Sequence, residues 1–369
     1  MTISRMSTAG QHASAISQIL RQQVALAKVQ VQVASGRRIQ TPADDPVAAT
    51  RILGIEGAQA RLEQYGRNAN MAEARLGYAE QAFTDLGNLL QRVHQLALQS
   101  NSGAMDDDSL QVIATELRER AGELLQIANR QDGSGEYLFS GYATGTRPFA
   151  PAGGDVSYSG DQGVRQLALS ATQSIADGFH GERVFLDVPE GNGVFTLRAG
   201  VHAGTGLSGV TQVTDRAAWS AAAAAAAAVP QPHRYTVQFT DSDADGTADS
   251  WAVQDAGGTQ VTTGAYVEGA AIAFHGIEFT IEGSPAPGDT FEVAPAGTES
   301  IFRTLDDLII ALERGAASPE SRARFGSDVN RALGQLTAAM DHVVNLRAET
   351  GARVSALDSA AVPRDALDY

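Results

Sequence analysis

The residues between Asp241 and Asp249 have the types and spacing of a calcium-binding loop. Four carboxylates alternate with small residues around one glycine, at Asp241, Asp243, Asp245 and Asp249. Calcium prefers several hard oxygen ligands held by a tight turn, and this pattern offers both. However, an EF-hand would place a bidentate glutamate where this chain has Ala252, and no helical pattern flanks the loop. The alternative interpretation is a solvated acidic turn between two strands that contain Phe239 and Trp251.

Other patterns with possible chemistry are weaker. The glycines at 204, 206 and 209 match a dinucleotide-binding spacing, but the sequence continues as a strand pattern rather than opening a helix. The seven histidines are scattered, and no zinc-protease or serine-hydrolase motif is present. The carboxylate pairs Asp44-Asp45 and Asp306-Asp307 suit helix starts and solvated faces better than acid–base catalysis. None of these patterns supports catalysis or a bound cofactor, so the sequence gives no reason to expect an enzyme.

Composition excludes several further classes of protein. The formal net charge is −16, and residues 151–299 hold 18 acidic residues against 5 arginines, so that region carries −13 and the rest −3. Such a polyanion is repelled by nucleic acid and by anionic membrane surfaces, so neither is an expected partner. No cysteine is present, which excludes disulfides and thiolate chemistry. No run of 18 apolar residues suggests a membrane span, and residues 1–7 lack the apolar stretch of a cleaved signal peptide.

The elements outside the middle of the chain have helical periodicity. Apolar residues spaced three and four apart form one coiled-coil-like seam at Leu62, Tyr65, Ala69, Ala72, Leu76, Ala79, Phe83, Leu86, Leu90, Val93 and Ala97. Asp45 and Pro46 provide an N-cap and a favoured first position for this helix. A second helix is predicted to open after Asp106-Asp107-Asp108-Ser109, whose carboxylates favour a helix N-terminus, and to be joined to the first through a turn at residues 101–103. Helices are also predicted over 300–313 and from Ser318-Pro319 onward, so the two ends of the chain should form one bundle.

The first helical segment, Ala13 to Ala34, differs from the others because it has two apolar stripes. One stripe includes Leu20, Val24 and Val31, and the other includes Ile19 and Leu26. A helix with two apolar sides packs against two partners at once. The partners are either other helices of the same chain or neighbouring copies of the protein.

The middle of the chain has the alternation and turn signals of short antiparallel strands. Strands are predicted at 235–239, 271–274, 278–281 and 290–293, and an alanine tract at 221–228 is a short helix or a loop. We therefore predict an α+β fold, in which a long antiparallel coiled-coil bundle of N- and C-terminal arms carries an inserted antiparallel β domain. The expected domains are an N-terminal helix at 1–45, a bundle at 46–136 plus 298–360, a β-rich outer insertion at 137–297 and a tail at 361–369.

The segment from Ser35 to Ala49, SGRRIQTPADDPVAA, resembles the N-terminal motif of the bacterial flagellin superfamily. Residues 86–103 and 346–358 are similar to two further helical segments of that superfamily. Within it, the segments 135–142, 146–149 and 156–161 resemble those of the hook-associated protein 3 family, which occupies the junction between hook and filament. Together these segments cover about half of the chain.

The resemblance implies a structural protein of the bacterial flagellum, exported unfolded through the flagellar type III apparatus without a cleaved signal. It implies self-association in a ring, contacts with the first hook–filament junction protein and with flagellin, and an export chaperone. The assembly interface would then comprise apolar residues of the first helix and residues of the loop that follows, namely Ile16, Ile19, Leu20, Val24, Leu26, Val31, Arg37, Ile39, Asp44, Asp45 and Pro46. Packing between copies becomes the preferred explanation of the two stripes.

One feature departs from the family pattern. Family members continue for several helical turns beyond residues 356–358, whereas here Pro363 is expected to break the helix and the sequence ends at Tyr369. The first helix would then lack the C-terminal partner helix that the family supplies. Two alternatives to the junction protein remain: a filament flagellin, or a secreted β-domain binding module carried on helical arms.

Overall fold

The computed structural model describes residues 8–102, 105–152, 155–229, 231–315 and 319–365. The chain forms two compact units, residues 1–67 and 68–369. The α+β fold class is confirmed. Residues 1–7, Gly103, Ser318 and the end of the tail at 366–369, for which the sequence made predictions, lie outside the described residues.

The first unit consists of α1 (Thr8–Ser35), a loop, and the beginning of α2 (Pro46–Ser100). Helix α1 ends at Ser35 and is followed by Gly36, whose φ of +67° is the left-handed conformation that glycine adopts without a steric cost. Helix α2 begins after Asp45, whose side chain accepts a hydrogen bond from the backbone N–H of Ala48 at 3.0 Å. The predicted cap and the proline at the first helical position are both present.

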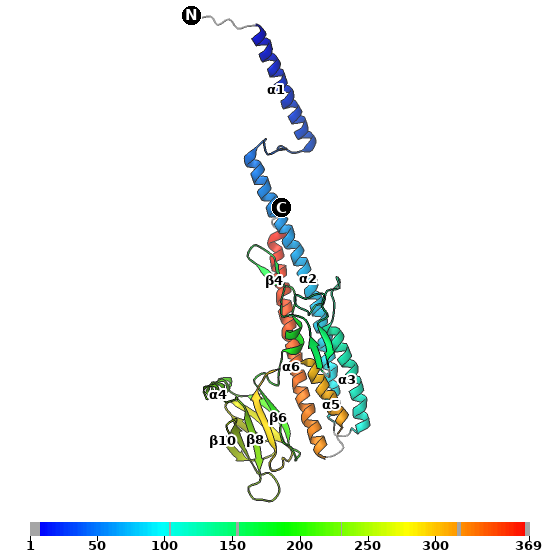
Figure 1. The fold of residues 1–369 in the computed structure, drawn as a ribbon, viewed down its shortest axis with the longest axis vertical. Helices are drawn as coiled ribbons and strands as arrows, with labels where there is room; N and C mark the ends of the chain where they lie inside the picture. Colours follow the sequence, from blue (N-terminus) through cyan, green and yellow to red (C-terminus); the bar gives the residue numbers. More distant parts are fainter. Residues whose placement is uncertain (1–7, 103–104, 153–154, 230, 316–318, 366–369) are drawn as a thin grey trace. The chain divides into compact units, whose positions relative to one another are not determined.

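The second unit contains a helical bundle made of the rest of α2 together with α3 (Asp107–Ala128), α5 (Ile301–Arg314) and α6 (Pro319–Asp365) (Figure 1). Asp106 caps α3 by accepting from the N–H of Ser109 at 3.0 Å, and Ser300 caps α5 by accepting from the N–H of Phe302. The predicted seam of α2 is buried from Ala69 to Ala97. Segments far apart in the sequence thus meet in one bundle, as predicted.

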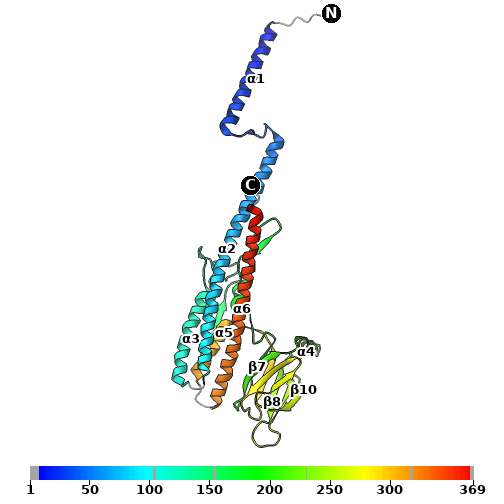
Figure 2. The same cartoon turned by 180° about the vertical axis from the view of Figure 1, so that it is seen from behind.

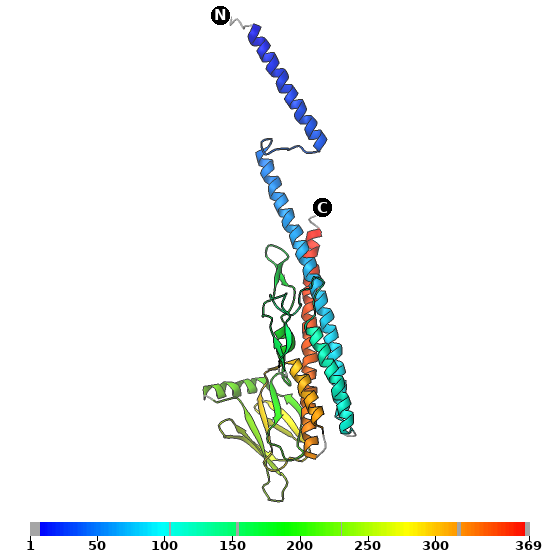
Figure 3. The ribbon, with the colours of Figure 1, turned by 45° about the vertical axis from the view of Figure 1, so that its right-hand side comes forward.

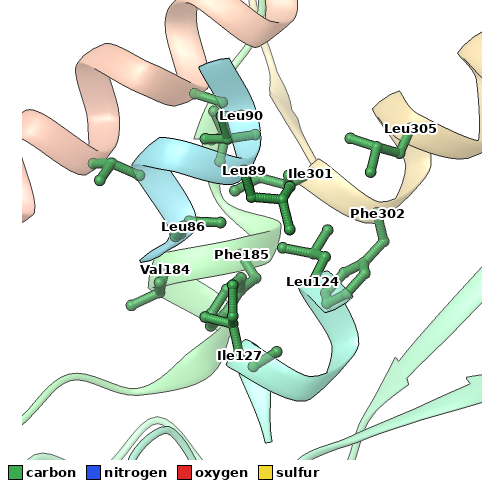
Figure 4. Close-up of a cluster of buried hydrophobic side chains, with 14 of the residues drawn as sticks. Leu86, Leu89, Leu90, Leu124, Ile127, Val184, Phe185, Ile301, Phe302 and Leu305 are labelled. Atoms are coloured by element: carbon green, nitrogen blue, oxygen red, sulfur yellow. The ribbon is translucent and has the colours of Figure 1, made fainter. Parts of the chain in front are cut away.

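The bundle core combines side chains from all of these helices. Figure 4 shows Leu86, Leu89 and Leu90 of α2 facing Leu124 and Ile127 of α3 and residues of α5. Leu86 and Leu90 are fully buried. Close packing of leucine and phenylalanine over this length removes a large apolar area from water, which is the main stabilising contribution to the bundle.

The segment after α3 folds against the bundle rather than into the outer sheets. It contains short strands and one π-helical turn: β1 (Phe149–Ala152), β2 (Asp155–Tyr158), β3 (Gln166–Ala168), β4 (Ser174–Ala176), η1 (Glu182–Leu186) and β5 (Val188–Pro189). Phe139, Phe149, Phe179 and Phe185 from this segment belong to the bundle core, and Phe185 appears there in Figure 4. The sequence analysis expected residues 137–297 to form one inserted β domain. In the structure, residues 137–188 instead contribute side chains to the core of the helical bundle.

A separate hydrophobic core lies between two antiparallel sheets (Figures 1 and 2). The larger sheet has the strand order β10-β9-β8-β13-β6, and the smaller has the order β11-β12-β7. Their strands are β6 (Phe195–Ala199), β7 (Leu207–Val213), β8 (Tyr235–Thr240), β9 (Ser250–Asp255), β10 (Gln260–Ala265), β11 (Ala271–Phe274), β12 (Ile277–Glu282) and β13 (Thr290–Pro295). We call the part from 190 to 297 the β unit. The four predicted strands are β8, β11, β12 and β13.

The alanine tract forms a helix, α4 (Arg216–Ala228), that packs on the β unit through Trp219 (Figure 3). Asp215 caps it by accepting from the backbone N–H groups of Ala217 and Ala218. Alanine has the highest helix propensity, so a good cap and one buried tryptophan are enough to hold this short helix. Of the two structures predicted for the tract, the helix is present.

The chain enters and leaves the β unit side by side. β5 pairs with β14 (Thr298–Glu299) in an antiparallel ribbon, with Val188 opposite Glu299. The N–H of Glu190 continues this ladder to the carbonyl of Gly297 at 3.0 Å. Gln335 of α6 adds a contact to the ribbon, because its side chain accepts from the N–H of Gly191 and donates to the carbonyl of Pro189.

The expected helix break at Pro363 is wrong. Helix α6 continues to Asp365. The proline lies two residues before the last described residue of the helix, and its missing N–H removes one intrahelical hydrogen bond.

Candidate assembly interface

Helix α1 presents its apolar stripes without any buried side chain among its described residues. Eight large apolar side chains are at least half exposed: Ile16, Ile19, Leu20, Val24, Leu26, Val29, Val31 and Val33. Monomeric soluble proteins rarely expose a contiguous apolar surface of this extent. The candidate interface residues predicted on α1 are therefore exposed along both apolar stripes of the helix.

The loop after α1 folds back onto the end of that helix. Asp44 forms an ion pair with Lys28 of α1 at 2.6 Å and accepts hydrogen bonds from the N–H groups of Gln40 and Thr41 at 3.2 and 3.0 Å. The side chain of Gln32 donates to the carbonyl of Arg38 at 2.6 Å. These contacts fix the backbone of residues 36–45, which we call the motif loop, relative to the last two turns of α1.

The electrostatics of the two aspartates match these roles. The hydrogen bond from Lys28, followed by those from the backbone of Thr41 and Gln40, lowers the pKa of Asp44 far below its ordinary value. The N–H of Ala48 at the start of α2 lowers the pKa of Asp45, and Arg38, 3.4 Å away, adds to this effect. Both carboxylates stay ionised at neutral pH, so they act as a loop clamp and a helix cap.

The remaining predicted interface residues of the loop lie at its surface. Arg37 and Pro46 are exposed, whereas Ile39 is half-buried. Arg37 makes no side-chain ion pair with the described part of the chain. The loop thus combines a rigid backbone with exposed apolar and cationic side chains.

The acidic loop at 241–249 joins β8 to β9 in a hairpin in which Phe239 lies opposite Trp251. Carboxylate oxygens of Asp241, Asp243 and Asp249 lie within 4.8 Å of one another, and Asp245 is outside this group. The loop satisfies its own carboxylates, because Asp241 accepts from the N–H groups of Ala244 and Gly246. Exposed acidic clusters of this kind occur without an ion, so the geometry alone assigns no metal.

The other sequence patterns have structural explanations. Gly204 packs so tightly that an added Cβ would lie 2.3 Å from the backbone nitrogen of Ala286, and Gly209 lies within β7. No helix opens at these glycines, so the dinucleotide interpretation has no structural support. Histidines contribute to none of the three-ligand clusters found among the described residues. No helix in the described ranges is long and apolar enough to cross a membrane.

Comparison with known proteins shows that the N-terminal part of the chain, which includes the motif loop, is similar to bacterial flagellins. The family model of the bacterial flagellin N-terminal helical region matches residues 6–144. Flagellar hook-associated protein 3 of Salmonella typhimurium is 29% identical over 181 residues, which is 49% of this chain and 56% of that protein. The Escherichia coli protein of the same name is 29% identical over 154 residues, covering 42% of this chain and 48% of that one. The chain thus spans about half the length of the curated relatives it matches.

Solved structures extend the similarity across most of the chain. Hook-associated protein 3 of Legionella pneumophila is 28% identical with a TM-score of 0.78 and covers 86% of this chain and 96% of that one. FlgL of Xanthomonas campestris is 31% identical with a TM-score of 0.72, covering 82% of this chain and 95% of that one. The chain belongs to the FlgL family of flagellar hook-associated proteins.

Two segments of this FlgL-family chain that resemble hook-associated proteins, 135–142 and 156–161, contact each other directly. Asp161 accepts hydrogen bonds from the N–H groups of Tyr142 and Ala143 at 2.9 and 3.1 Å, and the pKa of Asp161 is lowered by these bonds, that from Tyr142 first. The φ of Gly141 is +74°, and a Cβ there would lie 2.2 Å from Oδ1 of Asp161. The residues at 135–142 and 156–161 are therefore one structural feature that braces the side of the bundle.

Sequence analysis did not identify the buried cation of this FlgL-family bundle. Arg75 of α2 is 8% exposed at its side chain and pairs with Asp132 at 3.1 Å and Glu136 at 2.9 Å. It also donates to the carbonyl of Tyr137 at 3.2 Å and lies 3.9 Å from buried Asp177. The available signal was an arginine inside the apolar seam, between Ala72 and Leu76. It holds two segments against α2, the loop at 132–137 and the segment that contains Asp177.

Proposed function

We propose that this protein is a structural subunit of the bacterial flagellum at the junction between hook and filament, where it associates with copies of itself. The observation that carries the proposal is α1, a long helix with two exposed apolar stripes in a chain of the FlgL family. Burying these stripes between neighbouring helices would remove eight large apolar side chains from water. A closed ring of identical subunits provides such neighbours on both sides of each helix.

The partners follow from the same proposal. The subunit would contact the first junction protein on the hook side and flagellin on the filament side, and an export chaperone would cover its apolar segments before export. Location in the extracellular flagellum without a cleaved signal belongs to this proposal, as does the absence of catalytic activity. The division of charge is compatible with it, since the regions outside 151–299 carry only −3 and repel copies of themselves weakly.

The test replaces the chain in its own cells by a variant with Leu20→Asp and Leu26→Asp. Each substitution places a charge in one apolar stripe of α1, where packing against a neighbour would bury it without a partner. We expect cells that export the variant, lose swimming and release flagellin into the medium. The matched control carries Gln11→Asp and Gln18→Asp, which alter exposed polar positions outside the two stripes of the same helix.

The outcomes separate the proposal from its alternatives. Normal swimming with the double leucine variant would contradict assembly through α1. Polymerisation of the purified chain into long filaments would instead indicate a filament flagellin. Loss of function in both the leucine and the glutamine variants would show that α1 tolerates no charge, and a conservative Leu20→Met, Leu26→Met variant should then swim.

A further inference from the structure

A groove of about 290 Å³ lies on the bundle surface between α3, α5 and the β1–β2 hairpin. Its walls are apolar and include Leu125, Val156, Phe302 and Ile309. Phe302 and Ile309 are only 7% and 6% exposed, so their side chains are fixed by the core beneath them. The groove is therefore a preformed apolar surface.

Two carboxylates, Asp155 and Asp306, also line this groove. Asp306 is half-buried and makes no hydrogen bond or ion pair with the described part of the chain. Its neighbour Asp307, by contrast, pairs with Arg331 at 3.3 Å. Burial raises the pKa of Asp306, and repulsion from Asp307 and Asp155 raises it further, while Arg303 opposes the shift. A carboxylate held unpaired beside apolar side chains is costly, and a cation placed there would stabilise it.

These features define the chemistry of the missing occupant. It needs a positive charge for Asp306 and apolar atoms for the walls around it. An arginine fits both requirements, because its stem lies along apolar surface while its planar head pairs with a carboxylate. Apolar neighbours on the same helix face would extend the contact along the groove.

One exposed helix face of the chain has this pattern. Val47, Arg51 and Ile55 are spaced four apart on α2, so they form one stripe of about 12 Å. Val47 and Ile55 are each 66% exposed. Arg51 is also exposed, and its side chain forms no ion pair or hydrogen bond with the described residues. An apolar–cation–apolar stripe is complementary to a groove that is apolar with an acidic centre.

We propose that the Val47–Arg51–Ile55 stripe of one copy docks in the α3–α5–β1–β2 groove of a second copy, with Arg51 paired to Asp306. This contact rests on the proposed function, which supplies the neighbouring copy. It links the first unit of one subunit to the bundle of the next, so each copy offers both a stripe and a groove. A contact of this head-to-tail kind repeats around a ring.

The chain has no cysteine, so introduced cysteines report the contact without background. The variant Ile55→Cys, Ala121→Cys places one thiol on the stripe and one in the groove. In flagella isolated from cells that swim with this variant, mild oxidation should give a ladder of dimers and larger oligomers. Ile55→Cys paired with Val210→Cys, which lies on exposed β7, is the matched control and should give no ladder.

Charge reversal in the same background tests the ion pair itself. Arg51→Asp alone and Asp306→Arg alone should each reduce the ladder at least tenfold, and the two together should restore it. Arg61→Asp, a reversal of another exposed arginine on α2, should leave the ladder unchanged. Recovery in the double reversal is a result that a merely structural effect of either change would not produce.

The proposal is overturned by any of three results in cells that swim: no ladder, a ladder insensitive to the reversals, or an adduct with a different protein. Absence of the unmodified chain from isolated flagella overturns the proposed function and this contact with it. Because swimming is scored separately from cross-linking, a failed contact in motile cells leaves the proposed function intact.

Discussion

Nζ of Lys28 lies 2.6 Å from Oδ1 of Asp44, and this contact joins the last turns of α1 to the loop that follows. Lys28 is the one lysine among 27 basic residues of the chain. The flexible lysine side chain reaches from the helix to the loop, and N–H groups of the loop backbone donate further hydrogen bonds to the Asp44 carboxylate. The direction in which α1 leaves this loop therefore depends on this ion pair, on the hydrogen bonds to Asp44, and on the bond from Gln32 to the carbonyl of Arg38.

Asp44→Asn should loosen the motif loop without unfolding α2. The neutral amide loses the attraction of Lys28 and accepts weaker hydrogen bonds, so the amides of Gln40 and Thr41 should exchange hydrogen faster, by roughly tenfold. Hydrogen exchange measured by mass spectrometry or NMR checks this. Glu56→Gln, an exposed carboxylate on α2, is the control and should leave those rates unchanged.

The same loop should resist acid. Because the folded pKa of Asp44 is depressed, its stabilisation is present above the ordinary pKa near 4 and is lost only as pH falls through the lower folded value. Slow exchange at Gln40 and Thr41 should therefore persist at pH 4, after correction for the intrinsic exchange rate. Loss of protection already at pH 5 to 6 would contradict the clamp.

Leu90→Asp should unfold the helical bundle. Leu90 is fully buried in the α2 seam, where a charge has no partner, so the free energy of unfolding should fall by more than about 4 kcal/mol. Helical circular dichroism and the melting temperature measure this. Leu98→Asp, on the same helix but 53% exposed, should change stability by less than about 0.5 kcal/mol.

Arg75→Met should destabilise the bundle by about 3 to 5 kcal/mol, because Asp132 and Asp177 would lose a buried cation. Chemical denaturation measures the change, and Arg67→Met, an exposed arginine on the same helix, is the control. An equally large loss in the Arg67 variant, or a loss below 1 kcal/mol in the Arg75 variant, would show that the network contributes little.

The network around Arg75 also predicts a pH dependence. Burial alone would raise the pKa of Asp132, but hydrogen bonds from Ser134 and Glu136 and the charge of Arg75 outweigh it and lower that pKa. This stabilisation is therefore present above about pH 4 and declines as pH falls below it. Arg75→Met brings the folded pKa of Asp132 closer to its ordinary value, so the stability lost between pH 6 and pH 3 should be smaller than in the unmodified chain, and denaturation curves over that range would show it.

The packing of α4 should weaken at mildly acidic pH. Burial, and then repulsion from His275, lowers the pKa of His233, whose ring lies 4.2 Å from that of Trp219. A depressed histidine pKa means that the unfolded chain binds the proton first, so stability falls as pH drops below about 6.5. Tryptophan fluorescence in a Trp251→Phe background reports the change at Trp219, and His233→Phe should make the signal insensitive to pH between 5 and 7.

The long helices were predictable because their apolar periodicity continues over many turns. Their N-caps are residues next to the helix in the sequence, such as Asp45, Asp106 and Ser300. The four strong strands were predictable from alternation. Residues 137–188 were assigned to the outer insertion because the pattern from residue 137 onward is that of short strands, yet Phe139 and Phe185 pack in the bundle core. Short strands carry little local signal, and the choice between two cores depends on contacts that are distant in the sequence.

In the candidate interface, too, some features could be predicted from the sequence and others depend on contacts between distant residues. The exposed stripes of α1 followed from its periodicity, and the capping role of Asp45 from its position. Asp306 was interpreted as part of a solvated acidic pair, whereas the structure gives Asp307 an arginine and leaves Asp306 beside Phe302 in a groove. Whether a carboxylate on an amphipathic helix is solvated depends on the segment packed next to it, here the β1–β2 hairpin.

Because β5 and β14 pair at the two ends of residues 190–297, this segment could be replaced by another without changing the rest of the fold. Because the two ends of this segment already lie side by side, a short glycine-rich linker could close the gap at a small entropic cost. The bundle would keep all the side chains of its own core, since none of them lies between 190 and 297. Evolution can therefore resize, replace or recharge the β unit while the helical frame that holds the subunit in place stays the same.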